Sequence, residues 1–292
     1  MYEKGFVWQK QMPLVGKVRS DQLALQSLAQ ILSLLYMKIS VIQPDIAWEN
    51  KSLNFQNLSS LITPLYNKTD IVILPEMFNT GFSMNPVKLS EPPDGETFEW
   101  MRCIAEKGNF GLCGSYTVKE NLNFFNRWVF VSPKKAILHY NKRHLFSMGG
   151  EDKLFTAGRS KLIFSFRGVK ISPYICYDLR FPVWSRNTEG SDLIIYSANW
   201  PETRRNVWTT LLKARAIENQ CFVAGSNRIG IDGEGIRYCG DSMIINPRGE
   251  IISSAEDNGE CLVSSEISIT ELNSFRKKFP VKKDADGFSI NL

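Results

Sequence analysis

The stretch VKISPYICYDLRFPVWSRN, residues 169–187, places a cysteine where a reactive side chain could be exposed. Its first eight residues are apolar and rich in β-branched and aromatic types, a composition typical of a strand buried on both faces. Two charged residues and a proline come directly after this run, at Asp178, Arg180 and Pro182. Cys176 is therefore expected at the carboxyl end of the strand. A sharp turn there exposes a nucleophile and directs free backbone N–H groups at the reacting atom. The alternative is a buried structural cysteine, the commoner fate of a free thiol.

Three charged residues have the chemistry that a cysteine nucleophile needs. A thiol is mostly protonated near neutral pH, so a carboxylate such as Glu76 must accept its proton. Attack of the sulfur on an amide carbonyl creates an oxyanion, which the Lys142 ammonium and the backbone N–H of Tyr177 could stabilise together. Glu151 can hold the lysine and handle the proton on the leaving amine, and a lysine beside two carboxylates stays charged.

Each of these charged residues also has an ordinary interpretation. Glu76 follows a predicted strand, where an acid can stabilise a helix N-terminus through the helix dipole. Lys142 lies in the charged run NKRH and Glu151 in a predicted loop, so both could be solvated surface charges. Taken singly, the ordinary interpretation is the commoner one. The catalytic hypothesis depends on the joint placement of the three residues with Cys176.

Alternating strands and helices are expected to position these residues. A helix is predicted from Leu58, Leu61, Ile62 and Leu65, which share one face at i, i+3, i+4 and i+7. Strands are predicted at 38–43, 71–78, 110–117, 126–132, 135–140, 162–176 (two, joined at 167–168), 192–200 and 221–227, and further helices at 97–107 and 207–220. The last hairpins turn at 232–233 and 247–249. One α/β domain with helices outside a mixed sheet system is the simplest architecture for this pattern.

Several of the predicted strands end abruptly in polar or aromatic residues, as in VILPEMF, SPYICYD and LIIYSANW. The carboxyl edge of an α/β sheet is where such strand ends build a site. Glu76, Lys142, Cys176 and Asn199 are therefore expected to meet at that edge, with Asn199 as a substrate contact.

Composition excludes several classes of protein. The 292 residues are 43% hydrophobic and 22% charged, with a formal net charge of +5 that is too diffuse to predict a nucleic-acid groove. Six cysteines without a CxxC pair predict reduced thiols and a cytoplasmic protein. Only two histidines are present, without HExxH or a Cys/His cluster, so no zinc site is expected. The glycines of GIDGEG, 230–235, do not match GxGxxG, and no cofactor is predicted.

The first 36 residues look separate from the rest of the chain. Residues 23–36, LALQSLAQILSLLY, are apolar, but Gln and Ser interrupt them and they lie too far from the start for a signal peptide. The run is also too short to span a bilayer, so no membrane association is expected. Met37 precedes a convincing first strand and is the expected true start. Residues 1–36 are predicted to be a disordered or loosely packed extension of a domain at 37–292.

Three motifs in order resemble the nitrilase superfamily of carbon–nitrogen hydrolases: LPEMFNTGF, YNKRHLF with a following Glu151, and YICYDLRFPVWSRN. RFPVWSRN, ANWP, ARAIENQ and KFPVKKDADGF resemble its bacterial omega-amidase subgroup, also described as 2-oxoglutaramate amidases, and the match runs from residue 37 to about residue 288. The resemblance implies Glu76 as general base, Lys142 as oxyanion stabiliser, Cys176 as nucleophile and Glu151 as an auxiliary glutamate. It also implies an α-β-β-α sandwich, a homodimer, and hydrolysis of the terminal amide of small dicarboxylic monoamides through a thioester.

Other functions remain open at this point. A nitrilase or an N-carbamoyl amidohydrolase would use the same motifs, and a catalytically silent relative could serve as a binding module. All four catalytic positions being filled argues against the silent relative.

An omega-amidase must bind the far carboxylate of its substrate, which requires a cation beyond Cys176. Arg180 shares a face with Cys176 if a helix follows the strand, and its planar guanidinium can bind a carboxylate through two hydrogen bonds. Arg204 is a second candidate, and the alternative for Arg180 is an ion pair with Asp178 or another acid that braces the turn. The remaining candidate contacts each have a core or packing alternative; they are Phe82, Phe146, Trp200 and His144.

Overall fold

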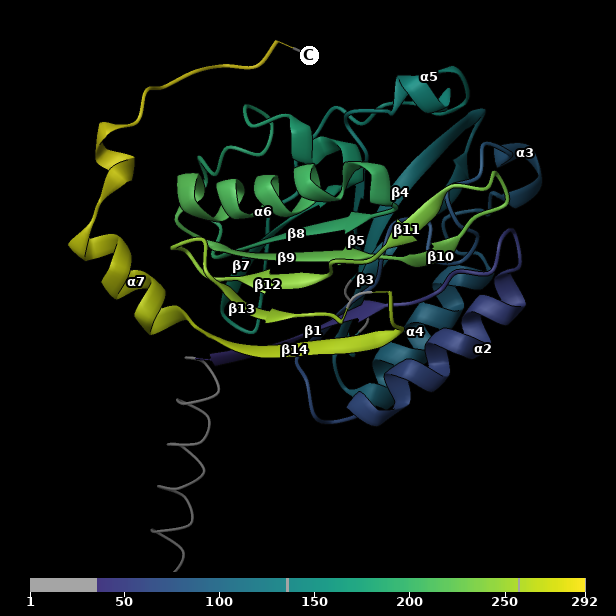
Figure 1. Ribbon diagram of the computed structural model, residues 1–292, viewed down its shortest axis with the longest axis horizontal. Helices are drawn as coiled ribbons and strands as arrows, with labels where there is room; N and C mark the ends of the chain where they lie inside the picture. The colour runs from purple at the N-terminus through teal and green to yellow at the C-terminus, as the bar shows by residue number, and fades with distance from the viewer. Residues whose placement is uncertain (1–35, 135–136, 257, 292) are drawn as a thin grey trace, which may run out of the picture.

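The computed structural model describes residues 36–134, 137–256 and 258–291. Within them, two six-stranded sheets lie one against the other, with helices outside them (Figure 1). In order across the first sheet, the strands are β14 (Cys261–Ser268), β1 (Tyr36–Gln43), β2 (Ile71–Ile73), β3 (Gly111–Glu120), β4 (Asn123–Val131) and β5 (Ile137–Asn141). In order across the second sheet, they are β13 (Ile251–Ser254), β12 (Met243–Ile245), β9 (Phe222–Asn227), β8 (Leu193–Ala198), β7 (Val169–Ile175) and β6 (Phe164–Phe166).

Helices complete the outer layers. Helices α2 (Lys51–Ile62) and α4 (Glu96–Gly108) cover the first sheet, and α6 (Arg205–Asn219) covers the second. The shorter or peripheral elements are α3 (Pro86–Leu89), α5 (Glu151–Leu154), α7 (Ile269–Lys278) and the two-stranded hairpin of β10 (Ile229–Ile231) and β11 (Arg237–Cys239). The expected α-β-β-α sandwich in one domain is therefore confirmed.

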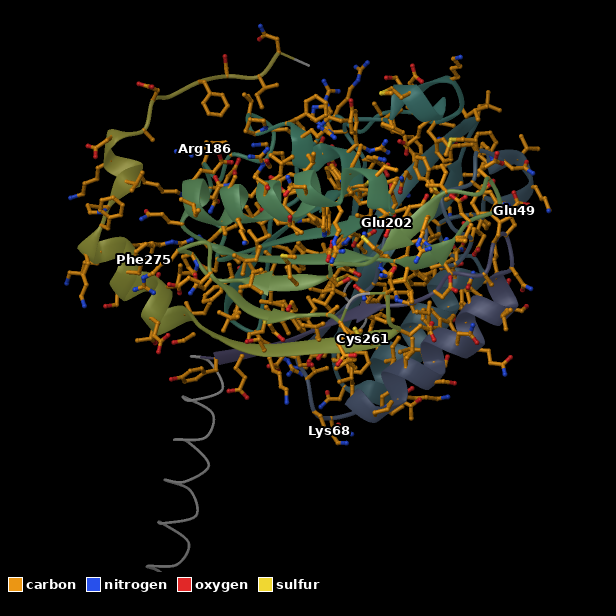
Figure 2. The ribbon with its side chains drawn as sticks, in the orientation of Figure 1. Glu49, Lys68, Arg186, Glu202, Cys261 and Phe275 are labelled. Atoms are coloured by element: carbon orange, nitrogen blue, oxygen red, sulfur yellow. The ribbon has the colours of Figure 1, made fainter. Side chains whose placement is uncertain are left out.

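Strand β2 shows how the sequence builds this layering. Ile71 and Ile73 pack into the core between the sheets, whereas Val72 packs against α2 and α4 on the other face. A strand covered on both sides needs apolar residues at every position, as its sequence has. Burying each such side chain stabilises the fold by about 1.5–3 kcal/mol. Figure 2 shows side chains filling the space between the two sheets.

Parallel pairing brings the functional strand ends to one edge. Strands β7, β8 and β9 run parallel in the second sheet, as do β1, β2 and β3 in the first. Ile175 at the end of β7 pairs with Ser197, near the end of β8. The Ser197 hydroxyl in turn donates to the carbonyl of Leu74, 2.7 Å away, just after β2. The loops that follow β2, β7 and β8 therefore lie together.

Two local expectations need correction. The strand predicted at 71–78 is regular only over Ile71–Ile73, because Pro75 has no N–H with which to continue the ladder, and Glu76 lies in the loop beyond it. The segment after β7 is a five-residue 3-10 helix, Cys176–Arg180, rather than an α-helix. It ends at Phe181 (φ −114°, ψ 86°), since the residue before Pro182 is disfavoured in the helical conformation.

The residues of the predicted N-terminal extension lie outside the described part of the chain, apart from Tyr36, which begins β1. In the part of the chain that the structure describes, no helix is long and apolar enough to cross a membrane. The predicted hairpin at Asp232 and Gly233 is confirmed as the turn between β10 and β11.

Candidate active site

The predicted catalytic residues meet where the two sheets are joined. Glu76, Lys142 and Glu151 are at most 1% exposed, and Cys176 is 9% exposed. The backbone N–H of Asn199, after β8, donates to Oε2 of Glu76 over 3.0 Å, and the Asn199 side-chain amide donates to the Glu76 carbonyl. These bonds hold the Glu76 loop of the first sheet against the end of the second sheet.

One lysine bridges two buried carboxylates. Nζ of Lys142 lies 2.8 Å from Oε1 of Glu76 and 2.8 Å from Oε2 of Glu151. The Asn126 side-chain amide donates to the same two carboxylates, over 2.8 Å to Glu76 and 2.9 Å to Glu151. Its oxygen accepts from Oγ of Ser115 over 2.9 Å, which prevents the amide from flipping. Sequence reasoning missed Asn126, which lies within β4 and is separated from the apolar run WVFV by Arg127, because nothing in the local sequence shows which side chains it meets.

The network keeps the lysine charged. Burial by itself would lower the pKa of the Lys142 ammonium, but attraction to Glu151 and Glu76 outweighs it and raises that pKa. The pKa of Glu151 is raised, first by burial and also by the neighbouring Glu76 carboxylate, while Lys142 opposes the change. The site therefore presents a fixed ammonium near neutral pH. An oxyanion that develops beside it would be stabilised without reorganisation.

Cys176 occupies a strained turn. Its φ of +41° lies in the left-handed region that residues with a Cβ rarely adopt. Burial raises the pKa of the thiol, the Glu76 carboxylate raises it further, and Lys142 acts in the opposite direction. The resting sulfur is therefore a protonated thiol, whose proton needs a base before it can attack. Sγ lies 3.7 Å from the carbonyl oxygen of Asn199.

Tyr177 follows the cysteine as the second residue of the 3-10 helix. The first N–H groups of a helix have no acceptor within it, so the Tyr177 N–H is available to a ligand oxygen beside Cys176. The phenol ring is held edge-on against Phe146 and Phe181, with ring centroids 5.1 Å away in each case.

A cavity of about 680 Å³ lies over Cys176 and Lys142. Six of the predicted substrate contacts line it: Phe82, Phe146, Arg180, Asn199, Trp200 and Arg204. Sequence reasoning missed further lining residues, which include Met84, Met148 and four from the β10–β11 hairpin: Asp232, Glu234, Ile236 and Tyr238. The hairpin lies more than 50 residues beyond Cys176 in the chain, and no local signal pointed to it.

Both candidate arginines have an aromatic neighbour in this cavity. The Arg180 guanidinium lies 5.3 Å from the ring centroid of Trp200, and that of Arg204 lies 5.4 Å from Phe146. Within the described residues, neither guanidinium forms an ion pair with an acid. The alternative that Arg180 pairs with Asp178 is therefore wrong. The helical spacing argument for Arg180 is also wrong, because a 3-10 helix has three residues per turn, yet Arg180 lines the cavity.

His144 does not line the cavity. Its Nδ1 lies 2.8 Å from Oδ1 of Asp178, and its ring stacks on Phe181 with centroids 3.7 Å apart. The expectation that His144 contacts the substrate is therefore corrected to its alternative, a histidine packed beside the site.

Among the described residues, no group of three or more His, Cys, Asp or Glu side chains could hold a metal ion.

Comparison with known proteins agrees with this fold. The family model described as carbon-nitrogen hydrolase matches residues 38–277, and the chain belongs to this family. The chain is 41% identical over 254 residues to the omega-amidase YafV of Escherichia coli K12, which covers 87% of this chain and 98% of that protein. It is 34% identical over 252 residues to the 2-oxoglutaramate amidase of Bacillus subtilis 168, covering 84% of this chain and 96% of that protein.

A solved structure supports the same assignment. XC1258 from Xanthomonas campestris, a CN-hydrolase superfamily protein with an arsenic adduct in its active site, is 38% identical. It superposes with a TM-score of 0.86, covering 88% of this chain and 99% of that one. The fold is therefore that of the carbon–nitrogen hydrolases, whose members act on carbon–nitrogen bonds other than peptide bonds.

Proposed function

We propose that this chain is an omega-amidase, which hydrolyses the terminal amide of small dicarboxylic monoamides such as 2-oxoglutaramate to the dicarboxylate and ammonia. The observation that carries the proposal is the buried Glu76–Lys142–Glu151 network beside Cys176, in a cavity that is also lined by two arginines with no acidic partner among the described residues. The names of the omega-amidase and 2-oxoglutaramate amidase relatives support the same substrate class.

The first half of the reaction forms a thioester. Glu76 takes the thiol proton of Cys176 as the sulfur attacks the amide carbon, and the new S–C bond leaves a negative charge on the carbonyl oxygen. The Lys142 ammonium and the Tyr177 N–H stabilise that oxyanion. Glu76 then returns the proton to the amide nitrogen, the C–N bond breaks, and ammonia leaves.

The second half releases the acid. Glu76 removes a proton from a water molecule, whose oxygen adds to the thioester carbon and recreates the oxyanion. The C–S bond then breaks, and the proton held by Glu76 returns to the sulfur. Glu151 holds Lys142 throughout, and it is itself held by the backbone N–H of Phe146, which donates to its Oε2 over 2.6 Å.

A panel of substrates tests the proposal. Ammonia release is measured for 2-oxoglutaramate and succinamate, for a neutral primary amide of similar size, for small nitriles, and for N-carbamoyl amino acids. The dicarboxylic monoamides are expected to give the highest kcat/KM, because they offer both a primary amide to Cys176 and a far carboxylate to Arg180 and Arg204. The neutral amide and the small nitriles lack the carboxylate, and the N-carbamoyl amino acids have a carboxylate but present a carbamoyl group in place of the primary amide. A higher kcat/KM for nitriles or carbamoyl compounds would contradict the proposal.

Arg180 is proposed to bind the far carboxylate. Arg180→Lys is expected to raise the KM for dicarboxylic monoamides by about tenfold, because an ammonium cannot reproduce two parallel hydrogen bonds to a carboxylate. Turnover of a neutral amide of similar size should be no worse than in the wild type. Steady-state kinetics on both substrates provide the measurement.

Arg102→Lys, on the outer helix α4, is the control and should change neither constant. Equal losses on charged and neutral substrates would make Arg180 a structural brace. In that case Arg204, which faces the same cavity, becomes the carboxylate-binding residue.

We also propose that the chain is a homodimer. Helix α7 and the segment after it lie outside the two sheets (Figure 1), and Phe279 and Phe288 in this region are 61% and 46% exposed. Phe275 on α7, which is labelled in Figure 2, is covered in part by Arg248, whose guanidinium lies 4.7 Å from the ring centroid. A second subunit would cover the two exposed rings. Light scattering at micromolar concentration should give twice the mass of one chain, and a monomer would count against the proposal.

A cytoplasmic location is proposed from the thiols. All six cysteines are free, which suits a reducing compartment. Fractionation of expressing cells should recover the protein with cytoplasmic markers.

A further inference from the structure

Asp178 lies two residues after the nucleophile and is completely buried. Four donors surround its carboxylate, two at each oxygen. Oδ2 accepts from the Ile175 N–H over 3.0 Å and from the Tyr140 hydroxyl over 2.7 Å. Oδ1 lies 2.9 Å from the His144 backbone nitrogen and 2.8 Å from Nδ1 of the same residue. A buried carboxylate requires such partners, because leaving it without them is costly. The position of the donors in the chain suggests a further role.

Three of the four donors link the segment that carries the nucleophile to the segment that carries the lysine. The bond from the Ile175 N–H to Asp178 spans Cys176, whose φ of +41° the surrounding structure must maintain. The bonds from Tyr140 and from the His144 backbone come from either side of Lys142. One carboxylate thus ties together the segments that carry the thiol and the ammonium.

Other bonds hold these segments less directly. The Lys142 N–H donates to the Asn126 carbonyl over 2.9 Å, and the Gly158 N–H donates to the Lys142 carbonyl over 2.8 Å. These bonds fix the lysine backbone relative to β4 and to the Gly158 loop, but they do not reach the Cys176 turn. The hydrogen bonds of Asp178 join the two segments directly, and the ring contacts of Phe146 with Tyr177 and of His144 with Phe181 pack the same segments together without fixing a polar atom.

We propose that Asp178 is a positioning residue, which sets the Lys142 ammonium at the correct place beside the Cys176 thiol. This role depends on the proposed amidase function, since alignment of the oxyanion stabiliser with the nucleophile is what the reaction requires. A displacement of about 1 Å between such groups can reduce the rate by about 100-fold.

Asp178→Asn tests the proposal with almost no change of volume. An asparagine has an NH₂ group in place of one oxygen, so in either orientation the NH₂ faces a backbone N–H, that of Ile175 or of His144. The kcat for 2-oxoglutaramate is expected to fall roughly 100-fold, with KM within about threefold of the wild type. The rate at which iodoacetamide alkylates Cys176 should fall with it.

Asp192→Asn is the matched control. Asp192 is also buried and accepts a backbone N–H, that of Lys170 over 3.0 Å, at the opposite end of β7 from Cys176. The Asp192→Asn substitution should lower the melting temperature and leave kcat and the alkylation rate of Cys176 unchanged. If Asp178 had only a structural role, Asp178→Asn would likewise lower the melting temperature at unchanged kcat, and that result would overturn the proposal. Equal losses of kcat in Asp178→Asn and Asp192→Asn would also overturn it.

If Asp178→Asn does not fold, Tyr140→Phe decides the question. It removes one donor to Asp178 and should lower kcat by roughly three- to tenfold at unchanged KM. An unchanged kcat would overturn the proposal. If the wild-type chain hydrolyses no amide at all, the proposed function fails, and the iodoacetamide rates of the variants still decide the role of Asp178.

Discussion

Cys176→Ala is expected to lower amide hydrolysis by at least about 10⁴-fold, because Cys176 is the proposed nucleophile and no other cysteine is among the described residues that line the cavity. Alanine is close in size to cysteine, so the fold should survive. Two measurements check the result: ammonia release with 2-oxoglutaramate, and the mass of the intact protein after rapid quenching. The wild type should show an acyl adduct on the peptide that contains residue 176, and the variant should show none.

Cys221→Ala is the matched control for this prediction. Cys221 is fully buried just before β9, does not line the cavity, and burial raises the pKa of its thiol to about 12. Its substitution should reduce stability modestly and leave kcat unchanged. An acyl adduct that persists in Cys176→Ala, on Cys221 or on any other cysteine, would move the nucleophile elsewhere.

Lys142→Met is expected to remove turnover and to destabilise the fold as well. The substitution keeps the length of the side chain but leaves Glu76 and Glu151 buried without their cation. Breaking a buried ion pair by removing one partner costs about 3–5 kcal/mol. Denaturant unfolding should show this loss, and kcat should fall by about 10³-fold, because the substitution removes the proposed oxyanion donor.

The loss of stability should depend on pH in a defined direction. The pKa of Glu151 is already raised in the folded wild type, first by burial, and removing Lys142 removes the cation that opposes the rise. A carboxyl whose pKa is raised on folding stabilises the protein below its unfolded-state pKa, and this contribution is lost as pH rises through the folded-state pKa. The stability deficit of Lys142→Met should therefore be larger at pH 8 than at pH 5.

Lys51→Met provides the control for the charge. Lys51 also pairs with a buried carboxylate, that of Glu91 at 2.6 Å, but the pair lies outside the cavity. Its substitution should cost stability and leave kcat unchanged. A Lys142→Met enzyme that keeps its kcat would exclude Lys142 as the oxyanion stabiliser.

Local sequence was sufficient for the elements and for the main candidates. Apolar runs such as those around Ile71 and Ile175 predict buried strands, because a strand covered on both faces has no position for a polar side chain. A charged or thiol side chain directly after such a run must lie at the sheet edge, which is why Glu76 and Cys176 could be singled out. The layered fold came from the motif resemblance rather than from this pattern.

The partners of these residues could not be predicted in the same way. Glu76 and Asn199 are hydrogen-bonded across 123 positions of the chain, and Asp178 and Tyr140 across 38. Neither pair has a spacing that a helix or a hairpin would impose. The role of Asn126 between two carboxylates depends on the stacking of loops on β4, so only the folded chain reveals it.

The sequence by itself thus determined the strand and helix periods, the stop at Pro182 and the chemical types available at the strand ends, because these depend on neighbouring residues alone. The tertiary structure decided which of those groups meet. It placed Arg180 and Arg204 against aromatic rings in the cavity and turned His144 toward Asp178. The physical reason is that burial and hydrogen bonding of a side chain are set by whatever segment packs over it, which here comes from the other sheet or from a distant loop.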